Sequence, residues 1–508
     1  MKKRVFSPPY LWIVGITIAA LCIIAPLFRS GFISTDDGGW MVIRLSAFYQ
    51  SLREGQIPVR FLGRLNNSYG YPVSNFLYPG FLYIGSLLHY VGFSFITSIE
   101  LIFAGAVLMS GIFTFLWLRK HTSDLSSFVG SLSVLFGPYL FFDIYKRGSI
   151  GEVLAIGVVS TCLYFLDSKK YFLLGFAFLL LIISHNSLAL LFIMFFFTMF
   201  IFRRDLKGVV SLIFGIGMAT FFWFPAFYEK HFVLFDSVLV SKPQEYFVQG
   251  TLIPLVGIFS LLALLWYVIK KPKGLSRAYI GGYIISMILA TPLTQFIWHI
   301  DDFAKLFQFP YRMLSGALLF GSYLIAVMLE KNSLRMKIVL LILFSMISIW
   351  QVTNAYPSIV YTNQPEGYYV TNEATTTVAN EYMPIWVREM TTERPTVRMG
   401  FEKGRGTISF TTQTTQKIDA QIQTAEESIL QINSIYYPGW GVIVNNIPVK
   451  LSYDNPNGLI RFPVGAGSFH VVAEFRETVQ RFIADIISVS FFVAYCLLWI
   501  FQKSKRTI

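Results

Sequence analysis

Residues 35–61 read TDDGGWMVIRLSAFYQSLREGQIPVRF, and residues 66–83 continue the same loop with NNSYGYPVSNFLYPGFLY. The stretch follows the first apolar segment closely and begins with two adjacent carboxylates, Asp36 and Asp37. Ionised groups beside membrane hydrocarbon are costly unless a site uses them. We therefore expect residues 30–95 to carry the functional site and the rest of the chain to be its scaffold. Within this loop, residues 40–52 have the spacing of an amphipathic helix lying on the membrane.

The composition predicts a polytopic α-helical membrane protein. Hydrophobic residues make up 55% of the 508 positions and charged residues only 14%, whereas soluble domains carry about 25% charged residues. The net charge of +13 comes from short basic clusters between apolar runs, which is typical of topology-setting loops. We therefore expect a lipid bilayer and no nucleic acid as partner. The three cysteines lie in apolar segments without CxxC spacing, so the sequence encodes neither a disulfide framework nor a zinc site.

The positive-inside rule predicts about twelve transmembrane helices if every basic cluster is cytoplasmic. The predicted spans are 10–29, 97–117, 125–142, 152–166, 171–184, 187–202, 208–225, 251–269, 279–297, 312–329, 338–355 and 482–501. An apolar piece at 76–93 does not fit, because counting it would move all later basic clusters outside. We expect it to lie along the outer interface, with an ordinary spanning helix as the alternative. Both termini are then predicted to be cytoplasmic in a multi-pass cell membrane protein.

This topology places the remaining polar groups together on the extracytoplasmic side. They are Asp36, Asp37, Arg44, Asp143, Arg147, Glu152, His185, Glu229, Asp301, Asp302 and Arg312. Several lie at the mouths of spans, where a charge can face a water-filled cavity rather than lipid. The pattern predicts a polar site embedded at the outer membrane surface.

Residues 356–480 differ from the rest in being rich in Thr, Gln, Asn and Glu. Period-2 alternation in stretches such as TISFTTQ, SILQINS and SFHVVAEF predicts strands, and the turn residues Asn445, Asn446 and Gly465–Gly467 predict hairpins. We expect an extracytoplasmic β-sandwich of about seven strands. The predicted division is a membrane domain at 1–355, this segment at 356–480 and a final span with a basic tail at 481–508. The stretch NEYMPIWVRE at 380–389 is expected to form a short linking helix.

No Walker A loop, GxGxxG, GxSxG or HExxH motif stands in a convincing context. The loop quoted above, together with YKRGSIGEVLA, SHNSLALL, FFWFPAFYE, FQFPYRML and YYPGWGVIVNNIPV, resembles a bacterial membrane family. This is the family labelled 6-pyruvoyl-tetrahydropterin synthase-related, with the neighbouring YfhO-like membrane proteins. The label does not imply pterin chemistry, because the three-histidine zinc site of those enzymes has no counterpart here.

The resemblance implies the GT-C glycosyltransferase architecture, in which an acidic residue of the first external loop acts on a polyprenyl-phosphate-linked sugar. Relatives show a His four residues after the loop aspartate and an Arg three residues further. Arg44 matches that Arg when counted from Asp37, whereas Met41 stands at the His position.

Transfer from a lipid-linked sugar needs a base for the acceptor hydroxyl and cations for the leaving phosphate. We expect Asp37 to be the base and Asp36 its neighbour, and both are the candidate ligands if a divalent cation, Mg or Mn, takes part. The expected substrate-binding residues are Arg44, Tyr69, Tyr71, Tyr78, Arg147, Glu152, His185 and Arg312. Pairing of both Arg147 and Arg312 with Glu152 or Asp301, and a satisfied helix-end histidine at 185, are the plain structural alternatives.

The predicted function is therefore transfer of a sugar from a polyprenyl-phosphate donor to an envelope glycan, lipid or protein acceptor. Two other classes stay open at this point. One is a lipid or glycan transporter, which predicts polar residues at the membrane midplane and broken helices. The other is a silent assembly protein that displays its β-domain.

Overall fold

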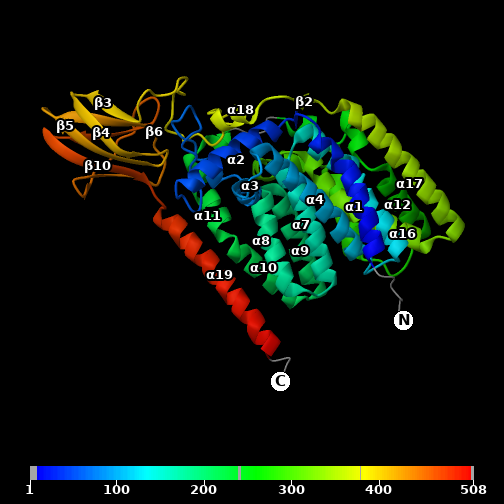
Figure 1. The fold of residues 1–508 in the computed structure, drawn as a ribbon. Coiled ribbons are helices and arrows are strands. Elements are labelled where there is room, and N and C mark those ends of the chain that lie inside the picture. Colours follow the sequence, from blue (N-terminus) through cyan, green and yellow to red (C-terminus); the bar gives the residue numbers. More distant parts are fainter. Residues whose placement is uncertain (1–8, 238–241, 378, 505–508) are drawn as a thin grey trace.

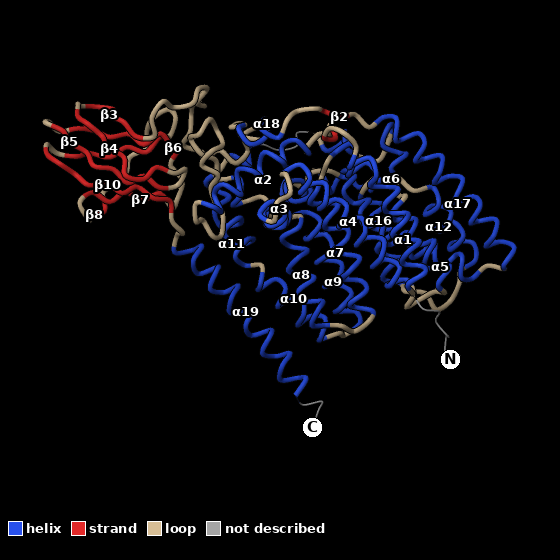
Figure 2. The backbone as a smooth tube through the Cα atoms, viewed as in Figure 1, coloured by secondary structure: helices blue, strands red, loops and turns tan. Residues whose placement is uncertain are grey.

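The computed structural model describes residues 9–237, 242–377 and 379–504 (Figure 1). Helices form one bundle, and strands β3 to β10 gather in a β-domain beside it, whereas β2 lies over the bundle (Figure 2). The helices α2, α3 and α18 lie on the face of the bundle that adjoins the β-domain, hereafter the loop face. Helix α1 begins and α19 ends on the opposite side (Figure 1).

The bundle contains both long helices and short helical segments. They are α1 Tyr10–Ile24, α4 Phe95–Leu118, α5 Asp124–Leu135, α6 Pro138–Phe142, α7 Ile150–Asp167, α8 Tyr171–Ser184, α9 Asn186–Arg203, α10 Leu206–Met218, α11 Thr220–Glu229, α12 Ile258–Lys270, α13 Arg277–Leu289, α14 Gln295–Trp298, α15 Asp301–Phe307, α16 Leu314–Lys331, α17 Leu334–Ala355 and α19 Val479–Ser504. The loop-face helices are α2 Gly38–Arg53, α3 Gly80–Tyr90 and α18 Glu366–Thr371.

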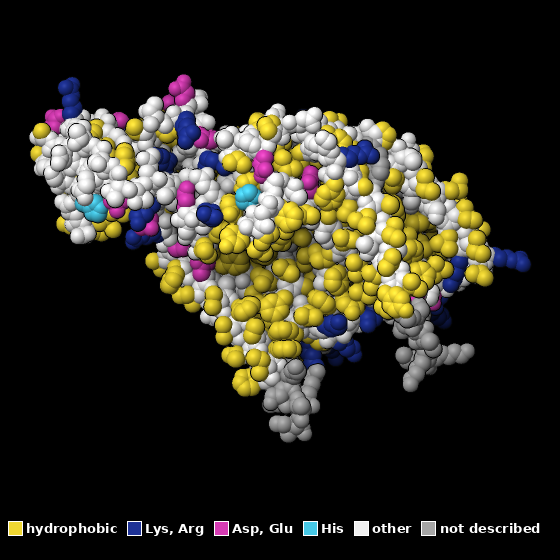
Figure 3. All heavy atoms as spheres, in the orientation of Figure 1, with side chains coloured by type: hydrophobic (Ala, Val, Ile, Leu, Met, Phe, Trp, Pro, Cys, Tyr) yellow, Lys and Arg dark blue, Asp and Glu magenta, His cyan; other side chains and the backbone are white. Residues whose placement is uncertain are grey.

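Eight helical stretches in the described part of the chain are long and apolar enough to cross a membrane. Two further pairs, Leu206–Phe232 and Arg277–Trp298, pass the same test but are bent by 64° and 83°, and α8 and α12 are shorter apolar helices. These stretches coincide with the predicted spans. Hydrophobic side chains cover most of the bundle surface in Figure 3, while acidic ones lie near the loop face and the β-domain. The chain is a polytopic helical membrane protein.

The span predicted at 125–142 is longer and broken in the structure. Gly137 and Pro138 separate α5 from α6, because proline cannot donate the hydrogen bond that a continuous helix needs at that point. A π-helical turn, Asp143–Arg147, then extends the stretch, and Gly148 ends it with φ +66°. This irregular end delivers three charged side chains to the loop face.

Helix α2 is not the membrane-surface helix that its spacing predicts. Eight consecutive residues, 41–48, are buried, so the helix is covered on all sides rather than on one. It packs on α3 and α4 from one side, and α18 of the later segment covers the other. A single-sequence pattern could not reveal α18, which lies more than 310 positions away. The apolar piece around α3 forms only 11 helical residues, too short for a hydrocarbon core of about 30 Å.

The β-domain contains two antiparallel sheets that pack as a sandwich. One has the order β4-β5-β10-β7-β8 and the other β3-β6-β9. The strands are β3 Met399–Lys403, β4 Gly406–Gln413, β5 Lys417–Thr424, β6 Ser428–Ile435, β7 Trp440–Val444, β8 Ile447–Pro448, β9 Leu459–Val464 and β10 Gly467–Phe475. Burial alternates along β5 and β6, as period-2 patterning requires. Asn445 and Asn446 take positive φ between β7 and β8, so the hairpin expected there is present.

Residues 380–389 form turns and not the expected helix. Pro384 removes one helical donor, and the segment pairs instead with the chain after α11. Leu234 N donates to Met383 O at 3.0 Å, and Ile385 N donates to Phe232 O at 3.0 Å. A second extended pairing, β1 Phe32–Ile33 with β2 Tyr361–Thr362, ties the start of the first loop to the same segment.

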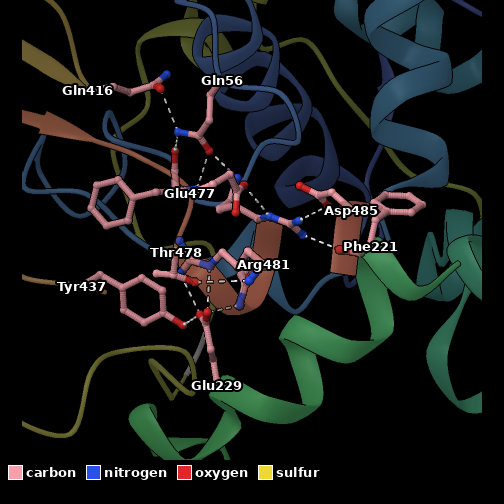
Figure 4. Close-up of polar contacts among 12 residues, drawn as sticks. Gln56, Phe221, Glu229, Gln416, Tyr437, Glu477, Thr478, Arg481 and Asp485 are labelled. Atoms are coloured by element: carbon pink, nitrogen blue, oxygen red, sulfur yellow. Dashed lines mark hydrogen bonds and ion pairs between the residues drawn. The ribbon is translucent and has the colours of Figure 1, made fainter. Parts of the chain in front are cut away.

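A buried ion-pair network fastens the β-domain to the bundle (Figure 4). Arg481 on α19 and Glu229 on α11 form two hydrogen bonds of 2.7 Å, and neither side chain is more than 2% exposed. Tyr437 of the β-domain donates to the same carboxylate at 2.8 Å. Beside it, Arg60 of the first loop contacts Glu477 and Asp485, each at 3.0 Å. Four segments therefore meet at one polar joint.

Candidate active site

The candidate site is organised around Glu152, which is fully buried in the first turn of α7. Its carboxylate accepts hydrogen bonds from Arg147 Nη1, from Arg312 Nε at 2.8 Å and from Tyr139 Oη at 2.9 Å. His185 Nε2 lies 3.7 Å from the same carboxylate. Both arginines thus pair with Glu152, which is the plain structural alternative, and they do so within one cluster.

Arg147 reaches this cluster because the π-helical turn points it inward. Its Nη1 also donates to Asp143 Oδ1 at 3.2 Å, and Asp143 is fully buried. The guanidinium lies over the Tyr311 ring at 5.2 Å and the Phe309 ring at 5.8 Å, where the ring faces favour a cation. Its Nη2 makes no hydrogen bond to any residue of the described ranges, so one edge of the group stays available.

The first loop is hydrogen-bonded to the turn that carries Arg147. Asp36 N donates to Lys146 O at 3.0 Å, and Asp37 N donates to Arg147 O at 2.8 Å. A side chain at Gly148 would overlap Thr35 Oγ1, which an ideal Cβ would approach to 2.1 Å. The backbones of the two segments are therefore held in direct contact, and this contact fixes where Asp37 lies.

Asp37 immediately precedes α2, but its side chain does not cap the helix. Thr35 Oγ1 takes that role by accepting from Gly38 N at 3.0 Å. The Asp37 carboxylate is 42% exposed, and its Oδ2 lies 3.9 Å from Arg147 Nη2. Burial by the surrounding protein raises the pKa of Asp37, against the opposing effect of Arg147 and Arg44. The carboxylate is thus accessible to a ligand and free of structural hydrogen bonds.

Arg312 enters from the short 3₁₀ turn Pro310–Met313 that precedes α16. Its Nη1 donates to Phe307 O at 3.1 Å and to Gln308 Oε1 at 2.6 Å, and the guanidinium lies 4.8 Å from the Phe309 ring centre. Within the described chain, Nη2 has no hydrogen-bond partner. Arg312 and Arg147 therefore each present an unused N–H edge beside the same carboxylate.

His185 and Tyr78 form the wall of the cluster next to α9. His185 caps that helix by accepting from Leu188 N at 3.3 Å, which is the satisfied helix-end role. The Tyr78 ring lies 4.9 Å from the imidazole ring, and both side chains are buried. Burial, followed by the nearby Asp37 carboxylate, raises the pKa of Tyr78. Both residues lie in the cluster, although neither lines an open surface.

Arg44 lies close by but is engaged elsewhere. Its Nε donates to Thr376 Oγ1 at 2.8 Å, and its Nη2 donates to Thr376 O at 2.5 Å. Its charge opposes, but does not cancel, the rise that burial causes in the pKa of Asp37. Arg44 thus fastens the late segment over α2 next to the site.

Three expected site residues lie apart from this cluster. Asp36 is exposed and pairs with Lys146 Nζ at 3.0 Å. Tyr71 is buried, accepting from Tyr382 N at 3.0 Å and sharing a 2.9 Å hydrogen bond with Thr377. The Tyr69 carbonyl accepts from Ile435 N at 2.8 Å, which joins the loop to the β-domain. The two tyrosines serve contacts between segments in this structure.

The two loop carboxylates do not form a metal site by themselves. No group of three or more His, Cys, Asp or Glu side chains suited to a metal lies in residues 9–237, 242–377 and 379–504. Each loop carboxylate also faces a cation, Lys146 for Asp36 and Arg147 for Asp37, which opposes divalent-cation binding. The donors present do not fit a divalent cation, so we derive no step through one.

The sequence grouped Asp143 with the polar residues of one predicted side but did not select it for the site, and Tyr139, Phe309 and Tyr311 were missed. Tyr139 and Asp143 precede Arg147 in the segment where a regular span was expected. The Gly137-Pro138 pair was the signal that could have indicated a break there. Phe309 and Tyr311 lie within the quoted FQFPYRML motif, on either side of Pro310, and their rings stack at 5.3 Å with an interplanar angle of 4°.

No family model and no curated protein matches the chain. Among solved structures, the chain is similar to ArnT from Cupriavidus metallidurans bound to undecaprenyl phosphate, with a TM-score of 0.48 and 12% identity over 72% of this chain and 68% of ArnT. It is also similar to the Archaeoglobus fulgidus oligosaccharyltransferase in complex with Zn and sulfate, with a TM-score of 0.40 and 14% identity over 74% of this chain and 58% of that one. The chain therefore spans less than two thirds of the oligosaccharyltransferase. At such identities these likenesses assign no activity to it.

Proposed function

We propose that the chain is a membrane glycosyltransferase of GT-C type that moves a sugar from a polyprenyl-phosphate donor to an extracytoplasmic acceptor. The acceptor is an envelope glycan, lipid or protein. In this proposal the loop face and β-domain are extracytoplasmic and both termini cytoplasmic. An enzyme outside the cytoplasm has no nucleotide sugars to use, so its donor must be carried on a membrane lipid.

The observation that carries the proposal is the meeting of one accessible carboxylate with two buried guanidinium groups. Asp37 Oδ2 lies 3.9 Å from Arg147 Nη2, and Arg147 and Arg312 share the Glu152 carboxylate. A base must be accessible, and a leaving phosphate needs fixed donors where charge develops. Glycosyl transfer from a lipid phosphate requires the base and the phosphate-binding groups to lie on the same face.

In the proposed step, Asp37 removes the proton of the acceptor hydroxyl while the hydroxyl oxygen bonds to the anomeric carbon of the donor sugar. The bond between that carbon and the phosphate oxygen breaks, and polyprenyl phosphate leaves with the bonding electrons. Arg147 and Arg312 bind the phosphate through their unused edges, since guanidinium groups suit phosphate geometry. Glu152 holds both groups in position beforehand.

A small apolar cleft lies next to the cluster. It has a volume of about 50 Å³ and runs between α5, α12, α16 and α17. Tyr139, which hydrogen-bonds Glu152, and Leu314, two residues after Arg312, line one end of it. Its volume is about that of one or two water molecules, so the cleft does not hold an isoprenoid chain in this structure. ArnT was solved bound to undecaprenyl phosphate, and the archaeal oligosaccharyltransferase AglB in complex with an inhibitory peptide and a dolichol-phosphate; both agree with the proposal without carrying it.

A transporter is the second candidate, because the two bent helix pairs resemble the broken helices of transporters. The charged cluster, however, lies at the loop-face ends of the helices and not at their middle. The resemblance to YfhO-like proteins stays a prediction, since no family model matches.

The test is reconstitution of the purified protein in liposomes with polyprenyl-phosphate sugars extracted from the source membrane. Release of free polyprenyl phosphate that depends on the protein and on acceptor supports transfer. Movement of intact donor across the bilayer without release would instead support the transporter.

A further inference from the structure

A polar cavity lies where α2 and the loop after it meet the β-domain, away from the arginine cluster. Its volume is about 380 Å³, within the roughly 300–1,000 Å³ of small-molecule sites. Glu54, Ser68, Arg394, Arg398, Gln413 and Thr415 are among the residues that line it. Nothing in the proposed transfer step uses this cavity.

The walls of the cavity are held together by direct contacts between the two parts of the protein. Glu54 Oε2 accepts from Thr415 N at 3.0 Å and from Thr415 Oγ1 at 2.5 Å. Next to them, Gln56 Nε2 donates to Gln416 Oε1 at 2.8 Å, a pair that faces each other in Figure 4. An ideal Cβ on Gly63 would lie 2.6 Å from Thr415, so the chains touch there. The cavity is therefore a shaped site and not a loose gap.

Arg398 supplies a cation that lacks an acidic partner. Its Nη1 donates to Ser68 O at 2.6 Å, and its Nη2 donates to Thr415 O at 3.0 Å. Its Nε is buried without a hydrogen-bond partner, and no described carboxylate lies within 4.0 Å of the guanidinium. Burial lowers the pKa of Arg398 to about 10, which reflects the cost of this charge. A bound anion would offset that cost.

Arg394 adds a second guanidinium at the rim. Its side chain is 72% exposed, and its Nη1 lies 3.3 Å from Glu373 Oε1. The only acidic lining residue in the described cavity wall, Glu54, already accepts three hydrogen bonds, from Thr415 and from Gln50 Nε2 at 3.1 Å. The cavity therefore presents net positive charge to a ligand.

The remaining lining is made of amides and hydroxyls, chiefly Gln50, Thr396, Gln413 and Thr414. Side chains that both donate and accept suit a ligand rich in hydroxyl groups. The described lining contains no aromatic residue, which disfavours nucleobases that bind by stacking. Hydroxyl recognition combined with positive charge fits an acidic saccharide.

We propose that this cavity binds an acidic saccharide segment, one bearing carboxylate or phosphate groups, of an extended acceptor glycan. The role as acceptor rests on the proposed function, whereas the binding itself does not. Asp37 precedes the first residue of α2, and Gln50 lies in its last turn. At about 1.5 Å per residue these residues are about 20 Å apart along the helix axis. The acceptor is then a chain long enough to occupy the cavity and Asp37 together.

The experiment titrates the full-length protein in detergent micelles with tri-galacturonate, without donor, and measures binding by microscale thermophoresis. Arg394→Gln removes an exposed rim cation and is expected to weaken binding about twofold to fivefold, since water weakens an exposed ion pair. Gln413→Trp fills the exposed edge of the cavity and should abolish binding. The matched control is Arg388→Gln, because Arg388 is also exposed and paired with an acid, Asp454, but does not line the cavity.

Binding that falls in both cavity variants, persists in Arg388→Gln and weakens with added salt supports the inference. Equal binding of neutral maltotriose or of hexaglutamate would overturn it, as would no binding of tri-galacturonate or equal affinity in all variants. The proposed function fails separately. A protein that binds tri-galacturonate here but never releases polyprenyl phosphate contradicts transfer alone, and one that transfers without this binding contradicts the cavity alone.

Discussion

Replacing Glu152 by Gln tests whether one buried carboxylate organises the arginine cluster. The substitution keeps the size of the side chain but removes the charge that Arg147 and Arg312 share. Gln can keep the Oε1 contacts to Arg147 and Arg312 and turn its NH₂ toward the Tyr139 hydroxyl, which can accept, so the main loss is the negative charge between the two guanidinium groups. Removing one partner of a buried ion pair costs about 3–5 kcal/mol, because the remaining charge is left uncompensated.

We expect Glu152→Gln to lower the free energy of unfolding by that amount, followed by tryptophan fluorescence during denaturation in micelles. We also expect transfer to fall by about 10²-fold, since a misplacement of about 1 Å costs that much in a positioned site. Asp143→Asn is the control, because Asp143 contacts only Arg147 in this cluster and Arg312 keeps its partner. A Glu152→Gln protein as stable and as active as wild type would refute the reasoning.

Three further predictions concern the joint, the pH dependence and the topology. Arg481→Met leaves Glu229 buried with Tyr437 and Asn75 as its partners in the described chain, so the free energy of unfolding should fall by about 3–5 kcal/mol. Adding Glu229→Gln should recover part of that loss. Fully additive unfolding free energies would contradict the pairing. Burial raises the pKa of Asp37 above its ordinary value of 3.8, and a general base must be deprotonated to act. The initial transfer rate should therefore fall as the pH is lowered, with a midpoint above pH 3.8. A rate that stays constant down to pH 3.8 would exclude Asp37 as the base. In a cysteine-free background, Ile447→Cys, in an exposed hairpin, should react with an impermeant maleimide in intact cells while Ser333→Cys should not, and the reverse pattern would invert the orientation.

The membrane spans and the strands could be predicted because their signals are local. Apolar run length identifies a span, and alternation identifies β5 or β6, without knowledge of any partner. The Gly137-Pro138 pair is a local signal for the break after α5, whereas the π-helical turn at Asp143–Arg147 depends on packing and on the contact of Gly148 with Thr35, which no local pattern encodes. They are what bring Arg147 to Glu152.

The candidate site was predicted in part for the same reason. Arg147 and Glu152 are five residues apart, and Arg312 begins a predicted span. The sequence therefore predicted that all three lie at helix ends on the same side of the membrane. Tyr69 and Tyr71 were expected to bind substrate, but Tyr71 hydrogen-bonds to Thr377 and Tyr382, and the Tyr69 carbonyl accepts from Ile435 N. Contacts across more than 300 positions are not visible in one sequence, and they also explain why α2 is covered.

Comparison of Asp37→Asn with Asp36→Asn in the reconstituted transfer assay tests the central claim most directly. Asp37 makes no capping hydrogen bond, since Thr35 supplies it, so Asn at this position should leave the fold unchanged. Asp36 pairs with exposed Lys146, and its loss should change little. We predict that Asp37→Asn lowers the rate of polyprenyl phosphate release by about 10² to 10⁴-fold, as expected for loss of a general base, while Asp36→Asn stays near wild type. Full release by a folded Asp37→Asn protein would contradict the account.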